Sequence, residues 1–340
     1  MINYQLLKKL CSESGVSGDE KRVRDIIIEE IKDCGCEYRV DNLGNLIVFK
    51  KGKNRPKVKL MLSAHMDEVG FIITHITDEG YLKFSTVGGI DETSLCGRYV
   101  TIGKNKINGV IGVKPIHLLK ADEREKKIAV KNLYIDIGAK DGKQAKRVVS
   151  LGDYACFLPT FNSDSRAVRS KAIDDRIGCL ALIEMIKSEL LYDMTFCFVI
   201  QEEIGLRGAK VASYTVNADS AIVVEATTAA DIPGSENKVC CLGDGAVVSF
   251  MDKRTIYDKE YYNLTLDLAR SNDIKVQVKK AVAGGNDAGA IQSSRDGVKT
   301  IALSLPCRYI HSEMALCYKS DIEALFELLK LLSVEIAGKE

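Results

Sequence analysis

The chain has 340 residues, 46% of them hydrophobic and 28% charged, so it holds enough apolar material for a large buried core. Forty-eight Lys and Arg residues against forty-seven Asp and Glu leave a net charge of +1, which provides no field for nucleic acid or an anionic membrane. No segment approaches the roughly 18 apolar residues of a membrane-spanning helix. We therefore expect a soluble, folded protein with neither kind of partner.

The cysteine content indicates a reducing compartment. There are eleven cysteines, an odd number, and several lie inside apolar segments, such as Cys179, Cys197 and Cys317. Lys8 and Lys9 interrupt the first apolar stretch, so we expect no signal peptide. These features predict a cytoplasmic protein.

The amino-terminal elements alternate between helix and strand patterns. Leucines recur at helical spacing from Leu6 to Leu10, and Ser17 with Glu20 predicts a capping box for a second helix. Strand patterns over 37–40 and 46–50 follow, and an apolar run over 58–64 ends at His65. These elements predict the opening of an α/β domain.

From residue 69 to 162 the pattern changes to short strands separated by glycines and charged residues, at 71–76, 81–84, 99–102 and 110–113. After this region the α/β alternation resumes, with helices expected over 175–188, 208–214, 259–271, 287–294 and 321–337, and strands over 194–200, 220–224, 246–251, 275–278 and 298–305. We therefore predict an α/β domain with a mixed sheet, built from residues 1–68 and 163–340. A small β-barrel-like domain, residues 69–162, is inserted into it.

His65 is the first candidate for chemistry. It ends an apolar strand, and open α/β sheets form their sites at the carboxyl ends of strands. Asp67, two residues on, is placed to orient the imidazole, as the outer partners of metal-bound histidines do. A hydrogen-bonded core histidine is the alternative.

Acidic residues at other element ends strengthen this interpretation. Asp174 opens a helix, where capping is the ordinary explanation, but a carboxylate also bridges two divalent cations about 3.5–4 Å apart. Glu202 and Glu203 follow a buried strand, where uncompensated negative charge implies a cation. Glu225 and His311 follow two further apolar strands. Imidazole with carboxylate ligands suits zinc, cobalt or manganese.

Five motifs together resemble a known family, the cytosolic metallopeptidases that include glutamyl aminopeptidases and tetrahedral, dodecameric aminopeptidases, some members of which are labelled cellulases (endoglucanases). The motifs span most of the chain and lie at residues 64–71, 174–178, 201–209, 284–289 and 308–312. The sequence departs from the family pattern at Glu225, where many members have Asp, and at Asn286, where Thr is frequent.

The resemblance implies a role for each candidate. Asp174 would bridge two divalent ions, zinc or cobalt before manganese. His65 and Glu225 would complete one metal site, and Glu203 and His311 the other. Glu202 would be the general base. From its spacing to His65 we also count Asp67 as a catalytic residue, one that supports the metal centre from outside the ligand set. The inserted domain would pair subunits into dimers, which could assemble into a tetrahedral dodecamer.

These inferences predict a two-metal aminopeptidase that removes the first residue of short peptides, with Glu202 activating a bridging water. Two alternatives remain open. A metal-independent glycosidase would also need paired carboxylates, although the chain has no Trp and only 6% aromatic residues to stack on sugars. A non-catalytic scaffold with this fold is the other, although every candidate ligand is present. His75 and His117 lie in the inserted region and are assigned no role.

Overall fold

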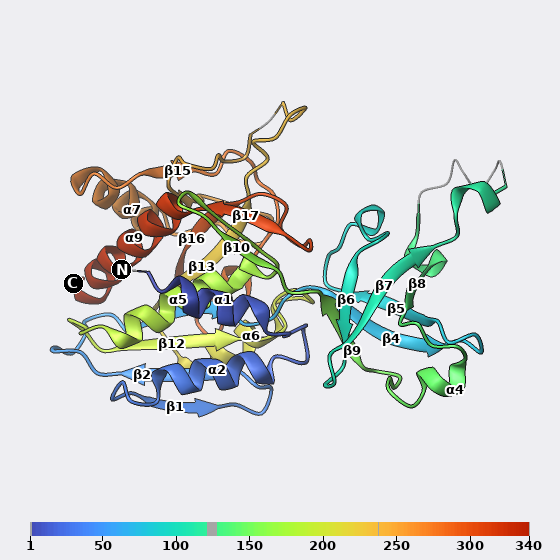
Figure 1. The fold of residues 1–340 in the computed structure, drawn as a ribbon. Coiled ribbons are helices and arrows are strands. Elements are labelled where there is room, and N and C mark those ends of the chain that lie inside the picture. The colour runs from blue at the N-terminus through green and yellow to red at the C-terminus, as the bar shows by residue number, and fades with distance from the viewer. Residues whose placement is uncertain (1, 121–127, 237, 340) are drawn as a thin grey trace.

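The structure, a computed structural model, describes residues 2–120, 128–236 and 238–339. It consists of a larger α/β part and a β-barrel to one side of it (Figure 1). The α/β part contains one eight-stranded sheet. Its strands, in spatial order, are β1 (Glu37–Val40), β2 (Leu46–Lys50), β12 (Met194–Val199), β3 (Leu60–His65), β13 (Ser220–Thr228), β16 (Lys299–Cys307), β14 (Ala246–Val248) and β15 (Val276–Val278).

The centre of this sheet is parallel. Strand β3 pairs in parallel with β12 and β13, and β13 pairs in parallel with β16. All six residues of β3 are buried, as expected for a strand with elements on both faces. The carboxyl ends of these four strands consequently meet at one edge of the sheet.

Helices pack on the sheet and on one another (Figure 1). Helix α5 contacts β3 and β13, and it is buried along almost its whole surface because α1 and α2 pack on it in turn. Helices α6 and α8 form a second pair, and α7 packs on α9. The helices are α1 (Tyr4–Ser12), α2 (Lys21–Ile31), α5 (Ile173–Lys187), α6 (Arg207–Val216), α7 (Lys259–Ser271), α8 (Ala288–Gln292) and α9 (Lys319–Gly338).

The barrel is closed and antiparallel, so it leaves no free strand edge. Its core is separate from that of the sheet, and the Phe71 ring meets Phe84 and Phe157 edge-on with centroids 5.1 and 5.3 Å away. The strands in order around it are β4 (Gly70–Ile76), β5 (Leu82–Val87), β8 (Leu133–Asp136), β7 (Ile107–Val113), β6 (Tyr99–Ile102) and β9 (Tyr154–Phe157). Short helices η1 (Glu92–Ser94), η2 (Ile116–Leu118), η3 (Val130–Asn132) and α4 (Gly142–Ala145) lie in its connections.

The predicted fold class is confirmed: the structure combines a mixed α/β sheet with a closed six-stranded barrel. Sequence patterns missed two barrel strands, β8 and β9. They also missed a three-stranded antiparallel sheet made of β10 (Phe161–Ser163), β11 (Ala167–Ser170) and β17 (Ala315–Tyr318). These strands are only three or four residues long, which is too short for a periodic signal.

The capping box predicted at Ser17 and Glu20 is wrong. Glu20 precedes α2 but makes no capping hydrogen bond, and its Oε1 accepts instead from the backbone N–H groups of Gly18 and Gln201. The Ser17 hydroxyl donates to Asp67 Oδ2 at 2.6 Å. Both side chains are therefore turned toward the edge of the sheet where the candidate residues lie.

Among the described residues, no helix is long and apolar enough to cross a membrane. All eleven cysteines lie in the described part of the chain, and all are free thiols. Burial raises the pKa of several of them, including Cys11 to about 12, so these thiols are unreactive core residues.

Candidate active site

The candidate residues gather at the carboxyl edge of the parallel strands. His65 is the last residue of β3, and Glu202 and Glu203 follow β12. His311 lies in the loop after β16, and Asp174 lies at the start of α5. The remaining ligand candidate, Glu225, differs from expectation. It lies within β13 and not at its end, because β13 stays paired with β16 for three more residues.

The His65 imidazole is buried and its two nitrogens face different groups. Nδ1 lies 3.1 Å from the carbonyl oxygen of Asp67, a contact that fixes the ring. Nε2 lies 3.2 Å from Asp174 Oδ1 and 3.4 Å from Glu225 Oε1. His65, Asp174 and Glu225 therefore form one compact group of donor atoms.

His311 has a matching arrangement. Its Nδ1 lies 2.9 Å from the carbonyl oxygen of Gly89, and its Nε2 lies 3.3 Å from Asp174 Oδ2 and 3.2 Å from Glu203 Oε1. Gly89 belongs to the connection after barrel strand β5, so the barrel supplies the contact that orients His311. Asp174 faces a different imidazole with each of its two oxygens, which is the placement that a bridging carboxylate requires.

The Asp67 carboxylate contacts several of the residues that form these groups. Besides the Ser17 hydroxyl, its carboxylate accepts the backbone N–H of Glu202 on Oδ1 at 3.0 Å and that of Glu203 on Oδ2 at 3.1 Å. Oδ1 also lies 3.4 Å from His65 Nδ1. Burial alone would raise the pKa of Asp67, but His65 and these donors hold it below its usual value, so the carboxylate is ionised.

The carboxylates outnumber the imidazoles, and this excess of negative charge raises the pKa values of several groups in the site. Burial opposes protonation of His311, but Asp174 and Glu203 raise its pKa to about 11. Burial and neighbouring carboxylates raise the pKa of Glu203, and they raise those of Glu202 and Glu225 well above the ordinary range. Divalent cations would relieve this repulsion.

The donor set fits divalent metal ions. Two groups of three, His65 with Asp174 and Glu225 and Asp174 with Glu203 and His311, place all their donor atoms within 4.8 Å of one another. Glu225 Oε2 is buried and has no hydrogen-bond partner in the described part of the chain, so it is available to a cation. A third grouping joins Glu202 to His65 and Glu203, which puts the Glu202 carboxylate beside the same centre.

Several supporting residues were not identified from the sequence. Asp175, joined to Asp174 by a cis peptide bond, accepts the His65 backbone N–H at 3.2 Å. Lys171, which is buried, donates to both carboxylate oxygens of Glu68 at 2.7 Å, beneath the loop that carries Asp67. The sequence shows that these residues are charged, but it does not show which groups they pair with in the fold. It therefore does not mark them as part of the site.

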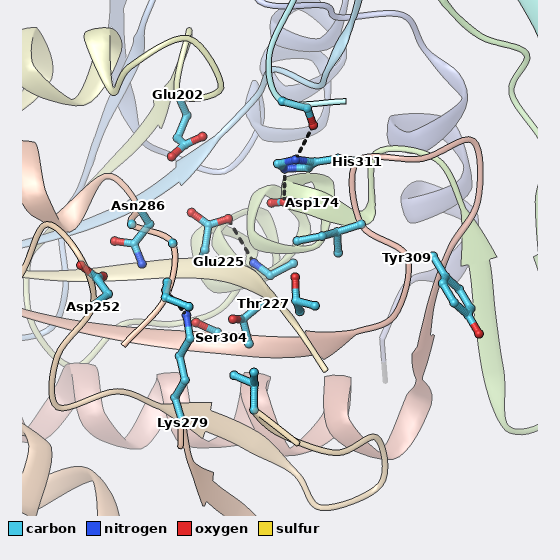
Figure 2. Close-up of a pocket in the computed structure, with 18 of the residues that line it drawn as sticks. Asp174, Glu202, Glu225, Thr227, Asp252, Lys279, Asn286, Ser304, Tyr309 and His311 are labelled. Carbon is cyan, nitrogen blue, oxygen red and sulfur yellow. Dashed lines mark hydrogen bonds and ion pairs between the residues drawn. The ribbon is translucent and has the colours of Figure 1, made fainter. Parts of the chain in front are cut away.

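An open cavity of about 600 Å³ leads from these residues. Figure 2 shows Glu202, Asp174, Glu225 and His311 on its wall, and the Lys279 side chain entering from the opposite side. The cavity is large enough for an amino-acid side chain and the adjoining peptide group.

A family model described as M42 glutamyl aminopeptidase matches residues 44–328. The chain belongs to this family. The resemblance drawn from the motifs is thereby confirmed, and the protein is a metal-dependent aminopeptidase, a hydrolase that acts at the amino terminus of peptides.

Relatives match over nearly the whole chain. The lysyl aminopeptidase of Pyrococcus furiosus is 33% identical over 99% of this chain and 98% of its own length. The TET aminopeptidase of a marine-sediment Thaumarchaeota archaeon has a TM-score of 0.93 at 32% identity, covering 99% of this chain and 96% of the other. The Pyrococcus horikoshii TET1 peptidase, described as assembling into a tetrahedron or a large octahedral shell, has a TM-score of 0.86 at 37% identity, covering 98% and 99% of the two chains.

Proposed function

We propose that this M42 enzyme is a two-metal aminopeptidase in which Asp174 bridges the two cations. The observation that supports this most directly is that each Asp174 oxygen faces a different histidine, each with its own further carboxylate. His65 and Glu225 would complete one metal site, and Glu203 and His311 the other. The nitrogen and oxygen donors suit zinc or cobalt, with manganese as a third candidate.

When bound, the two cations would supply Lewis acidity that polarises the peptide carbonyl and makes a water easier to deprotonate. Glu202 would accept the proton from the attacking water and deliver it to the leaving amine. Its position supports this role, because Asp67 fixes the Glu202 backbone N–H and the side chain lines the cavity beside the ligand candidates. We assign Asp67 the role of fixing the positions of Glu202, Glu203 and His65 relative to one another.

The acid-rich wall also supports action at a free amino terminus. Glu202 and Glu225 line the cavity, and their carboxylate oxygens can accept hydrogen bonds from an amino group that enters. Binding of that group next to the metals would restrict cleavage to the first peptide bond. A cavity of about 600 Å³ favours short, extended peptides as substrates.

We propose that residues 1–68 and 163–340 form the catalytic domain and that residues 69–162 form an inserted domain through which subunits pair. Such dimers would assemble further into a tetrahedral dodecamer, a proposal supported by two solved relatives, one described as a dodecamer and the other as assembling into a tetrahedron or a large octahedral shell. The free cysteines favour a reducing cytoplasm as the site of action.

Metal removal and restoration test the proposal. The enzyme is stripped with a chelator, metal content is measured, and hydrolysis of aminoacyl chromogenic substrates is followed while zinc, cobalt or manganese is added. We expect activity to return as the metal content approaches two ions per subunit, and N-acetylated substrates to remain intact. Full activity in the metal-free enzyme, or equal cleavage of blocked substrates, would contradict the proposal. A glucan assay with the metal-free enzyme tests the glycosidase alternative.

A further inference from the structure

Two buried cysteines lie opposite each other at the base of the hairpin that carries His311. Cys307 is the last residue of β16, and Cys317 lies in β17. Between them, Arg308 and Leu316 form an antiparallel bridge, in which each donates its backbone N–H to the carbonyl of the other, at 2.9 and 3.0 Å. In an antiparallel pair the residues that flank such a bridge also face each other, so Cys307 stands opposite Cys317.

This placement suits a disulfide bond. Residues next to a pair that exchanges both hydrogen bonds form a non-hydrogen-bonded pair, whose Cα atoms lie about 4.5 Å apart in a regular ladder. Disulfides join residues whose Cα atoms are about 4.4–6.8 Å apart. The Cys307 thiol is turned toward the opposite strand, because its sulfur lies 3.4 Å from the carbonyl oxygen of Leu316. A hydrogen bond with the Cys317 thiol, together with burial, raises the pKa of Cys307 well above its usual value, so the two thiols are in contact.

The segment between the two cysteines carries little regular structure. Residues 309–314, which we call the His311 hairpin, form neither helix nor strand, and Tyr309 and Met314 are exposed. His311 Nδ1 lies 2.9 Å from the carbonyl oxygen of Gly89, which ties this segment to the barrel connection. A segment of this kind opens locally at a smaller free-energy cost than the buried strands do. A covalent bond at its base would limit that opening, and would therefore act on a segment that lines the cavity.

We propose that Cys307 and Cys317 are a redox-sensitive pair that forms a disulfide in the presence of a peroxide, and that this disulfide fastens the base of the His311 hairpin. One thiolate attacks a peroxide oxygen and breaks the O–O bond, which gives a sulfenic acid and hydroxide. The sulfur of the opposite thiol then attacks the sulfenic sulfur, so the S–S bond forms and water leaves. In sum, two thiols lose two electrons and two protons, and hydrogen peroxide is reduced to two waters. A thiol reductant restores both cysteines by exchange.

Burial determines when this reaction takes place. Both thiols are closed off from bulk water, as the other core cysteines are, so the pair stays reduced in a reducing compartment. Peroxide reaches the sulfurs when the His311 hairpin opens, which is the motion that the disulfide then restricts. The second step needs no further opening, because the partner sulfur is already in contact. Formation of the bond does not depend on the proposed function; only its effect on a metal held by His311 does.

A peptide map of the oxidised enzyme tests whether the bond forms. Trypsin cleaves after Lys and Arg and therefore separates the two cysteines, giving peptides 300–308 and 309–319 with one cysteine each. The full-length wild-type enzyme is treated with hydrogen peroxide, its remaining thiols are alkylated, and it is digested without reductant. We expect the two peptides to be joined, with a mass two hydrogens below their sum, and to separate when dithiothreitol is added. Oxidation of Met314 adds an oxygen without joining the peptides, so mass distinguishes the two reactions.

Hydrogen exchange tests whether the bond fastens the hairpin. At equal metal content, the amides of residues 309–314 should exchange at least about 10-fold more slowly in the oxidised enzyme. Cys307→Ala and Cys317→Ala should each lose both effects, whereas Cys96→Ala, at an exposed cysteine, should keep them. Peptides that stay separate while Cys96 is oxidised would overturn the proposal, as would hairpin exchange that the bond leaves unchanged. The wild-type map decides the first point even if a variant fails to fold, and either result leaves the aminopeptidase proposal intact.

Discussion

Replacing Asp67 with Asn tests whether this carboxylate organises the site. The Asn side chain has nearly the same shape as that of Asp but carries no charge. Only one of its two terminal atoms, the amide oxygen, can accept hydrogen bonds. If the oxygen faces Ser17 and the Glu203 N–H, the NH₂ group faces the Glu202 N–H, donor against donor. One hydrogen bond to a charged group, about 1.5–3 kcal/mol, is then lost and the others weaken. We expect the free energy of unfolding of the metal-free protein to fall by about 3 kcal/mol.

The same change should lower the affinity for metal ions, because Asp67 fixes the backbone of Glu203 and lies against the ring of His65. Loss of such outer contacts typically lowers metal affinity or activity about 10- to 100-fold. Urea unfolding measures the first effect and cobalt titration calorimetry the second. Asp33→Asn, at an exposed position, is the control. If Asp67→Asn matched the wild type in both measurements, the role given to Asp67 would be refuted.

Three further substitutions test the packing and electrostatics around the site. Gly178→Ala would place a Cβ 2.4 Å from an oxygen of Asp175, so urea unfolding should show a loss of about 1–3 kcal/mol. Phe157→Ala removes a ring from the barrel core and should cost about 3–5 kcal/mol by the same measurement. Asp231 accepts two hydrogen bonds of 2.7 Å from Arg308, next to the His311 loop. Burial would raise the pKa of Asp231, but the Arg308 guanidinium and the Leu242 N–H hold it below its usual value. This ion pair therefore stabilises the protein at neutral pH, and the stabilisation is lost as the pH falls through the lowered pKa of Asp231. The difference in unfolding free energy between wild type and Asp231→Asn should consequently shrink below about pH 4.

The fold was predictable where the sequence pattern is long and regular. Buried strands such as 194–199 and amphipathic helices such as 259–271 carry clear periodicity, and the sequence placed both within one residue. Strands β8, β9, β10, β11 and β17, of three or four residues each, are too short to carry such a signal. Their existence depends on tertiary pairing.

The candidate ligands were also predictable, because four of the five lie at or near the end of a buried element and the fifth, Glu225, lies within the buried strand β13. Their supports were not. Ser17 and Glu20 fit a helix-capping pattern equally well, and only the folded chain brings Ser17 to Asp67, fifty residues away. Gly89, which orients His311, comes from the barrel segment and has no chemical side chain that could mark it. The sequence thus indicates the candidate groups, while contacts between distant segments determine how they are held.

The most direct test of the central claim is the metal content and turnover of Glu202→Gln, measured on the same sample. This change preserves the size of the side chain and its backbone bond to Asp67, but it removes the proton acceptor. The account predicts that wild type and variant both bind two metal ions per subunit and that the variant loses at least about 10²-fold in kcat on aminoacyl substrates. Full turnover with both metals bound would contradict the assignment of Glu202 as the base, and loss of a metal ion would show that Glu202 is a ligand instead.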